Sequence, residues 1–248
     1  MPAVSDLRNA LSPTEAPLHG WQGERAAPEP QGFQPLALSV AVSRETGAKG
    51  VTVARSVSKR LGWQYYDQEM LEYIAQEDRH RQELFDGLES DALQWIEVEL
   101  ERLIQDQRLS PDRGLLDLAR VVLALGSKGQ AVILGRGAGC ILPREAVLRV
   151  RLIAPLAERI AYMAQYQRLT PEQAAEVVCA SDRQRAEFMV THFFRRPDDV
   201  YQYDMVLNPS LLGVDAVTQA IAQAALVKNT HWQETLQPAL TDSVVPVT

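Results

Sequence analysis

The stretch LALSVAVSRETGAKGVTVARSVSKRLG (36–62) decides the fold. Its first eight residues form a nearly continuous apolar run, which is typical of a strand buried on both faces of a parallel sheet. A polar turn containing Gly47 and Gly50 follows. Apolar residues at helical spacing then predict a helix over 51–61 that Gly62 ends. The order of strand, glycine turn and helix is typical of a parallel α/β domain.

The rest of the chain continues this alternation. A long acidic helical stretch over 67–106, with 13 carboxylates against three arginines, separates the second predicted strand from the third. We therefore expect a parallel α/β sheet with right-handed crossovers, and a helical insert over one edge. Further strands are predicted over 63–67, 131–137, 147–154 and 203–208, and further helices over 111–125, 155–168, from Thr170 onward and over 214–227.

The two ends of the chain differ from this central part. Residues 1–35 contain six prolines and three glycines, and residues 229–248 are polar and show no periodicity. Such stretches bury too little apolar surface to offset their ordering entropy. We therefore expect two disordered tails around one domain that spans 36–228.

The composition excludes several classes of protein. The 248 residues are 46 % hydrophobic and 23 % charged, with no run long enough to span a bilayer and no secretory signal. Two cysteines, Cys140 and Cys179, make neither a disulfide framework nor a cysteine zinc site, so we expect a cytoplasmic protein. The net charge of −7 argues against a nucleic-acid partner. Only 4 of the 25 basic residues are lysines, and arginine binds phosphate oxygens with a planar fork.

The loop SRETGAKGVT (43–52) lies where a strand passes into a helix, so its N–H groups can converge on an anion. It does not match the strict pattern GxxxxGK[ST], because the first glycine is absent and Lys49 precedes Gly50. A plain turn with an exposed lysine fits the loop equally well.

Two further segments contain arginines in places that favour a ligand. GRGAG (135–139) ends a strand, and ligands of open α/β sheets bind at that end, so Arg136 is a candidate. The other segment is DRQR (182–185), taken together with Arg195 and Arg196. Arg183 and Arg185 splay to different sides of a helix, while Asp182 and Arg185 can pair. Such arginines can stabilise a transferring phosphoryl group, although a solvated helix is the simpler interpretation.

Together these segments resemble the cytidylate kinase-like family of P-loop nucleoside monophosphate kinases, over about residues 37–226. SRETGAKG followed by VARSVSKRLGWQYYD is similar to that family's SRE-x-G-x-x-G loop, first helix and YYD strand end. GRGAGCIL and APLAERI resemble its GRD-x-G segment and E-R helix. Asp182 and Arg185 match the D-x-x-R of its lid helix, and YDMVLNPSLLGVDAV resembles its YD-x-V-x-N segment.

The resemblance implies a five-stranded parallel sheet flanked by helices, an ATP site at the first loop, an acceptor site under the insert (about 67–126) and a lid (about 168–200). It implies that Arg136 holds the phosphate or sugar of the acceptor, that Arg183 and Arg185 close over the γ-phosphate, and that Asp67 and Asp204 lie near the nucleotide. The implied phosphate cradle consists of Gly47, Ala48, Lys49, Gly50, Val51 and Thr52.

The chain departs from the family pattern at four positions, one of which is Lys49, where the family's loop carries glycine. Gly50 and Val51 replace the lysine after the last loop glycine and the Ser/Thr that binds Mg²⁺, and Gly137 replaces the aspartate of GRD. Lys49 is therefore left to serve the ATP phosphates, and Thr52 to serve the Mg²⁺.

Three hypotheses stay open at this point. The first is a phosphotransferase that moves the γ-phosphoryl group of Mg·ATP to a nucleoside monophosphate or a related small acceptor, and the retained arginines favour it. The second is a non-catalytic nucleotide sensor, which the displaced Lys49 favours. The third is a scaffold whose acidic insert docks a protein partner.

Overall fold

The structure is a computed structural model that describes residues 33–236, and it contains a five-stranded sheet in the order β2-β3-β1-β4-β5. Every neighbouring pair of strands is parallel, so the predicted fold class is confirmed. The predicted tail residues 1–32 and 237–248 lie outside the described residues. The strands are β1 (Ser39–Arg44), β2 (Gln64–Tyr66), β3 (Ala131–Leu134), β4 (Val147–Leu152) and β5 (Met205–Leu207).

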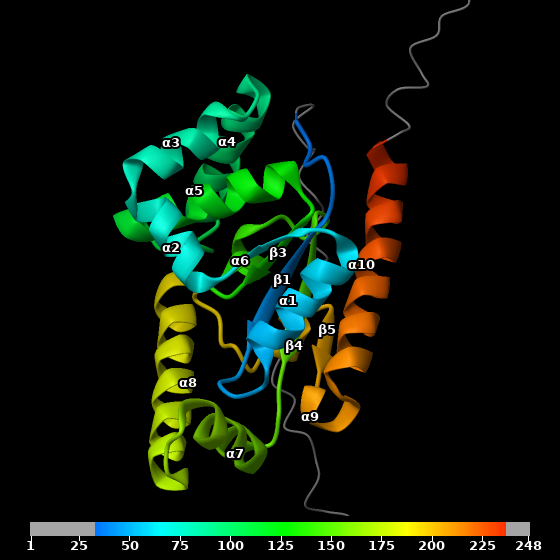
Figure 1. Ribbon diagram of the computed structural model, residues 1–248. Coiled ribbons are helices and arrows are strands. Elements are labelled where there is room, and N and C mark those ends of the chain that lie inside the picture. The colour runs from blue at the N-terminus through cyan, green and yellow to red at the C-terminus, as the bar shows by residue number, and fades with distance from the viewer. Residues whose placement is uncertain (1–32, 237–248) are drawn as a thin grey trace, which may run out of the picture. The chain divides into compact units, whose positions relative to one another are not determined.

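Helices cover both faces of the sheet (Figure 1). On one face, α1 (Gly50–Leu61) packs beside α10 (Val214–Leu236). On the other face lie α5 (Arg113–Lys128) and the short α6 (Ala138–Ile141). The insert adds three helices, and an arm of two helices follows β4. These are α2 (Gln68–Gln76), α3 (Asp78–Asp86), α4 (Ser90–Gln105), α7 (Leu156–Gln167) and α8 (Pro171–Phe193), with a 3₁₀ turn (Val200–Gln202) and α9 (Pro209–Leu212) before α10.

Alternation along the central strands divides the core in two. Val40 and Val42 of β1 pack toward α1 and α10, whereas Ala41 between them faces the α5 side. In β4, Val150 belongs to the first of these two clusters. Successive strand residues point to opposite faces, so Arg149 and Arg151 project toward the α6 side.

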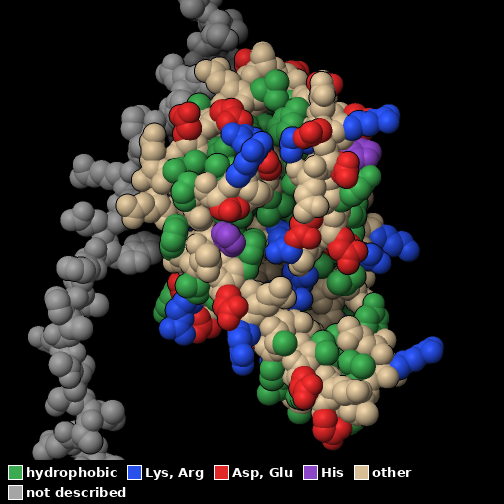
Figure 2. All heavy atoms as spheres, turned by 90° about the vertical axis from the view of Figure 1, so that its left-hand side faces the viewer, with side chains coloured by type: hydrophobic (Ala, Val, Ile, Leu, Met, Phe, Trp, Pro, Cys, Tyr) green, Lys and Arg blue, Asp and Glu red, His purple; other side chains and the backbone are tan. Residues whose placement is uncertain are grey.

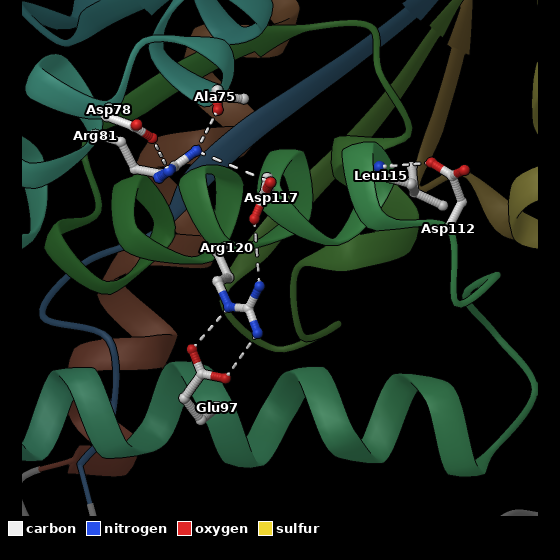
Figure 3. Close-up of polar contacts among 8 residues, drawn as sticks. All are labelled: Ala75, Asp78, Arg81, Glu97, Asp112, Leu115, Asp117 and Arg120. Atoms are coloured by element: carbon white, nitrogen blue, oxygen red, sulfur yellow. Dashed lines mark hydrogen bonds and ion pairs between the residues drawn. The ribbon is translucent and has the colours of Figure 1, made fainter.

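The insert is held by both apolar packing and ion pairs. Trp95, Ile96 and Leu100 of α4 are buried in the core with α5, so this stripe is core packing and not a surface for a partner helix. Arg120 of α5 donates to both carboxylate oxygens of Glu97 (Figure 3). In the same view, the guanidinium of Arg81 contacts Asp78, Asp117 and the carbonyl of Ala75.

The start of α8 matches its sequence signal. Thr170 accepts a hydrogen bond from the N–H of Gln173, whose side chain accepts from the N–H of Thr170, and Pro171 occupies the first helical position. This reciprocal capping satisfies two backbone donors that have no acceptor within the helix.

The last helix is longer than the sequence predicts. α10 runs to Leu236, so the prediction of a disordered tail beginning at 229 is wrong for residues 229–236. Hydrogen bonds across the fold hold this extension: the side chain of Asn229 accepts from the N–H of Leu38 at 2.9 Å, and Trp232 donates to the carbonyl of Pro35 at 3.0 Å. Within residues 33–236, no helix has the length and hydrophobicity of a membrane span.

Asn229→Ala should lower the free energy of unfolding by about 1–3 kcal/mol, because it leaves a half-buried N–H of Leu38 without an acceptor. For a chain of this size that corresponds to roughly 2–4 °C in Tm per kcal/mol, measurable by thermal denaturation. The control is Gln233→Ala, an exposed position on the same helix. Equal Tm values for the two variants would contradict the role of Asn229.

Candidate functional site

A cavity of about 270 Å³ opens at the carboxyl ends of β1, β3 and β4, beside α8. Among the described residues that line it there is no aspartate, glutamate or lysine. In Figure 2, Lys and Arg side chains gather in a hollow in the middle of the face shown. The lining contains seven arginines: Arg44, Arg108, Arg136, Arg149, Arg151, Arg185 and Arg195.

Burial makes this concentration of positive charge costly. Burial, followed by the positive charge of Arg185, lowers the pKa of Arg44 to about 10. Burial is also the main cause of the lowered pKa of Arg149 and of Arg185. Like charges brought together out of water destabilise the empty site, so the cavity favours a polyanionic ligand.

Arg136 lies in this cavity as the sequence analysis predicts. Its backbone is left-handed, with φ of 50°, an unusual conformation for a residue other than glycine. The guanidinium lies 4.9 Å from the ring centroid of Phe188 on α8 and pairs with Glu72 on α2. Its Nε is buried without a hydrogen-bond partner among residues 33–236. One donor of Arg136 is therefore available to a ligand.

The departure at Gly137 has a structural cause. A Cβ atom at this position would lie 2.2 Å from the ring of Phe193 at the end of α8. The backbone of Gly137 is also left-handed, with φ of 68°. An aspartate does not fit here, because the ring of the buried Phe193 occupies the space that its side chain would need.

The predicted lid residues contact the loop between β1 and α1. Asp182 accepts from the N–H of Thr46 at 2.7 Å and pairs with Arg159 of α7 at 2.5 Å. Arg185 donates to the side-chain hydroxyl of Thr46 and lies 3.6 Å from Asp182. The Asp182–Arg185 pair expected from their spacing therefore forms. Arg183 is exposed and does not line the cavity.

The predicted cradle residues lie beside the cavity, outside its lining. Lys49 is the left-handed N-cap of α1, and its ammonium lies 6.0 Å from the ring centroid of Tyr162 on α7. Val51 and Thr52 are exposed on the first turn of α1, and Ala48 is buried. α1 has neither a side-chain cap nor an acidic residue in its first turn. Its first N–H groups consequently lack an internal acceptor.

Two predicted carboxylates have structural contacts. Asp67 caps α2 by accepting from the N–H of Met70 at 3.1 Å and lies 3.7 Å from Arg55. Asp204 accepts from the backbone N–H of Arg149 at 2.8 Å and from Lys228 at 3.1 Å. Neither carboxylate lines the cavity.

The sequence analysis missed four of the cavity arginines as site residues, and it named a fifth, Arg195, only together with DRQR. Arg149 and Arg151 could have been found from the sequence. Two charged residues that lie two positions apart in an otherwise apolar strand share one face of the sheet, which indicates a charged site there. Arg44 directly ends β1, at the edge where ligands bind. Arg108 and Arg195 are brought in from loops after α4 and α8, and no spacing rule in the sequence connects them.

The donor set for a metal is limited. Within the part of the chain that the structure describes, no group of three or more His, Cys, Asp or Glu side chains could hold a metal ion. The cavity lining is cationic. The described residues therefore do not form a metal centre of their own.

The parallel sheet in the order β2-β3-β1-β4-β5, with helices on both faces, defines the class of the chain as an α/β protein. The sequence matches the model of the Cytidylate kinase-like family over residues 39–211, and the chain belongs to that family. The resemblance inferred from its motifs is thereby confirmed. A search of curated proteins found no match.

The chain is similar to several solved structures at low sequence identity. An uncharacterized protein from Eubacterium ventriosum has a TM-score of 0.53 and 15% identity, covering 76% of this chain and 98% of that one. A shikimate kinase from Bacteroides thetaiotaomicron has a TM-score of 0.42 and 13% identity, covering 75% and 97%. A gluconokinase from Sinorhizobium meliloti has a TM-score of 0.40 and 13% identity, covering 81% and 99%.

A substitution at Gly47 tests how closely the loop between β1 and α1 packs against α7. Its φ is +84°, and a Cβ atom would lie 2.6 Å from the carbonyl oxygen of Arg159. Gly47→Ala should destabilise the protein by about 1–3 kcal/mol more than Gly62→Ala, because overpacking adds to the cost of the left-handed backbone. Gly62 has φ of +70° and no atom within 4 Å of the added Cβ. Urea denaturation measures the difference, and equal losses would refute the close approach.

Proposed function

We propose that the chain is a phosphotransferase that moves the γ-phosphoryl group of ATP to a nucleoside monophosphate or a related small acceptor. The observation that carries the proposal is the cavity lined by seven arginines and no carboxylate among the described residues. One guanidinium group can donate two parallel hydrogen bonds to two phosphate oxygens. Phosphoryl transfer is catalysed mainly by positioning the reactants and by stabilising negative charge. Membership of the cytidylate kinase-like family supports the same reaction class.

The proposed place for the ATP phosphates is the N-terminus of α1. The N–H groups of Gly50, Val51 and Thr52 lie in its first turn, which has no side-chain cap and no acid. Such a helix end attracts anions through its free donors and its dipole. Gly47 and Ala48 complete the loop on the approach to this turn.

The cavity arginines supply the other roles. Arg185 lies between this loop and the cavity, where it would hold the transferring phosphoryl group, as preorganised cations do. Arg136 has a free buried Nε and would hold the phosphate of the acceptor. Arg183 is exposed, so its predicted part in closing over ATP requires α8 to move.

ATP and magnesium place different demands on these residues. The first turn of α1 offers N–H donors that suit phosphate. For magnesium, Thr52 offers a hydroxyl on the same turn, and phosphate oxygens of ATP would supply other ligands. When bound, the ion would neutralise charge on the phosphates.

Two observations favour the alternative, a non-catalytic nucleotide sensor. The carboxylate of Asp182 occupies the N–H of Thr46 in the loop, and the side chain of Lys49 lies against Tyr162. A coupled assay of ATP consumption with a panel of nucleoside monophosphates separates the two functions. Turnover with one acceptor supports the kinase, whereas ATP binding without turnover supports the sensor.

Arg136→Lys should weaken binding of the acceptor by about 1–3 kcal/mol while ATP binding changes less. Lysine keeps the charge but loses the planar fork that binds two oxygens. Calorimetric titration with each ligand measures both affinities. Arg79→Lys is the control, since Arg79 is exposed on α3 and pairs with Glu83. If acceptor affinity is unchanged in Arg136→Lys, its proposed role is lost.

Lys49→Ala should weaken ATP binding, and the loss should shrink as the salt concentration rises. The long side chain of Lys49 can swing from Tyr162 toward the phosphates, and the attraction is largely coulombic. Lys59→Ala is the matched control in the last turn of the same helix. Titrations at low and high salt check this, and an identical affinity in both variants would remove Lys49 from the site.

A further inference from the structure

The seven arginines form two groups within the one cavity. Arg44 experiences the positive charges of Arg136, Arg151 and Arg185. Arg108, Arg149 and Arg195 form the second group: all three line the cavity with Cys140 and act electrostatically on its thiol. The proposed phosphoryl transfer uses the first group only. The second group is therefore a concentration of charge without an assigned purpose.

The second group is assembled from three separate elements. Arg149 projects from the middle of β4, Arg108 follows α4, and Arg195 follows α8 at the rim of the cavity. Residues so far apart in sequence meet here only through the tertiary fold. Arginines that only interact with solvent lie on the surface, whereas Arg149 comes from a strand inside the sheet.

Arg149 is built into the interior. Its exposed fraction is 8 %, and its Nε is buried without a hydrogen-bond partner among residues 33–236. Another nitrogen of the guanidinium donates only a long bond of 3.4 Å to the carbonyl of Leu142. A buried charged donor without a partner costs free energy, which a bound anion would recover.

Asp204 acts electrostatically on Arg149, and Glu99 on Arg108, but neither carboxylate forms an ion pair with these arginines in the described part of the chain. Asp204 accepts from the backbone N–H of Arg149, and its charged partner is Lys228 at 3.1 Å. Glu99 pairs with Arg102 at 3.6 Å. Within the described part of the chain, Arg108, Arg149 and Arg195 form no ion pair.

We propose that Arg108, Arg149 and Arg195 form a second anion subsite, which binds a phosphate or carboxylate group of the ligand that does not react. The proposal rests on the proposed function, because it assigns the transferring phosphoryl group to the other arginines. It narrows the substrate class to small molecules with two separated anionic groups.

The spacing of β4 sets the scale of such a ligand. Arg149 and Arg151 lie two residues apart on one face of the strand, so their Cα atoms are separated by roughly 6.6 Å. Arg151 belongs to the first group and is held by the hydroxyl of Ser43 at 2.8 Å. A ligand that engages both groups must therefore carry its anions several bonds apart.

Calorimetric titration with alkane bisphosphonates of increasing chain length tests the subsite without turnover. Methylphosphonate is the single-anion reference, and succinate and glutarate test whether carboxylates also bind. We expect one intermediate chain length to bind about tenfold or more tighter than methylphosphonate, as a further charged hydrogen-bonded contact implies. Affinity that is independent of chain length would overturn the proposal.

Two variants assign the effect to these residues. Arg149→Met keeps length and apolar packing, and Arg195→Ala changes only the rim, so it decides the matter if Arg149→Met does not fold. Both should abolish the length preference, reducing the best bisphosphonate to the affinity of methylphosphonate. Arg196→Ala is the control, because Arg196 adjoins Arg195 but pairs with Asp198 at 2.7 Å, outside the cavity lining. Wild-type affinities in Arg195→Ala would overturn the subsite.

The two proposals fail in different ways. A length preference lost in Arg195→Ala, but without phosphoryl transfer to any acceptor, supports the subsite and removes the kinase. Transfer to an acceptor with one anionic group, with an unchanged KM in Arg195→Ala, supports the kinase and overturns the subsite.

Discussion

The ion pair between Arg159 and Asp182 determines how the site is assembled. Arg159 is buried on α7 and also donates to the carbonyls of Ala154 and Thr46, at 3.0 and 3.2 Å. Asp182 on α8 bonds the N–H of Thr46 from the other side. The loop, α7 and α8 thus share the buried guanidinium of Arg159, which also lies 3.4 Å from Glu45 of the loop. The position of Arg185 over the loop depends on this tie.

Much of the fold could be predicted because it follows from local periodicity. Apolar runs ending in glycine gave the central strands, and the Thr170–Pro171 signal gave the start of α8. The end of α10 could not be predicted in this way. Asn229 and Trp232 extend that helix through hydrogen bonds to Leu38 and Pro35, far away in the sequence. These residues are polar and show no hydrophobic periodicity, so the sequence does not predict their hydrogen bonds to distant residues.

The candidate site was predictable only in part. Arg136 and Arg185 stood in motifs, and the structure brings both to one cavity. Arg108 and Arg195 lie in loops, so their meeting depends on how the insert and the lid pack. The loop residues Lys49 and Thr52 were singled out by position in a pattern, but a pattern does not fix the direction of a side chain. Where Lys49 points follows from its left-handed backbone and from Tyr162.

The seven arginines of the cavity lining have a consequence for how ligand affinity varies with pH. Even Arg44, whose pKa burial lowers to about 10, remains protonated near neutral pH, so the charge of the cavity is constant there. A phosphate monoester gains its second charge near pH 6, whereas a carboxylate is fully ionised well below that. Binding curves between pH 5 and pH 8 will therefore trace the ionisation of the guest molecule. Because the cavity charge stays constant, affinity that rises between pH 5 and pH 8 indicates a phosphate ligand, and constant affinity indicates a carboxylate.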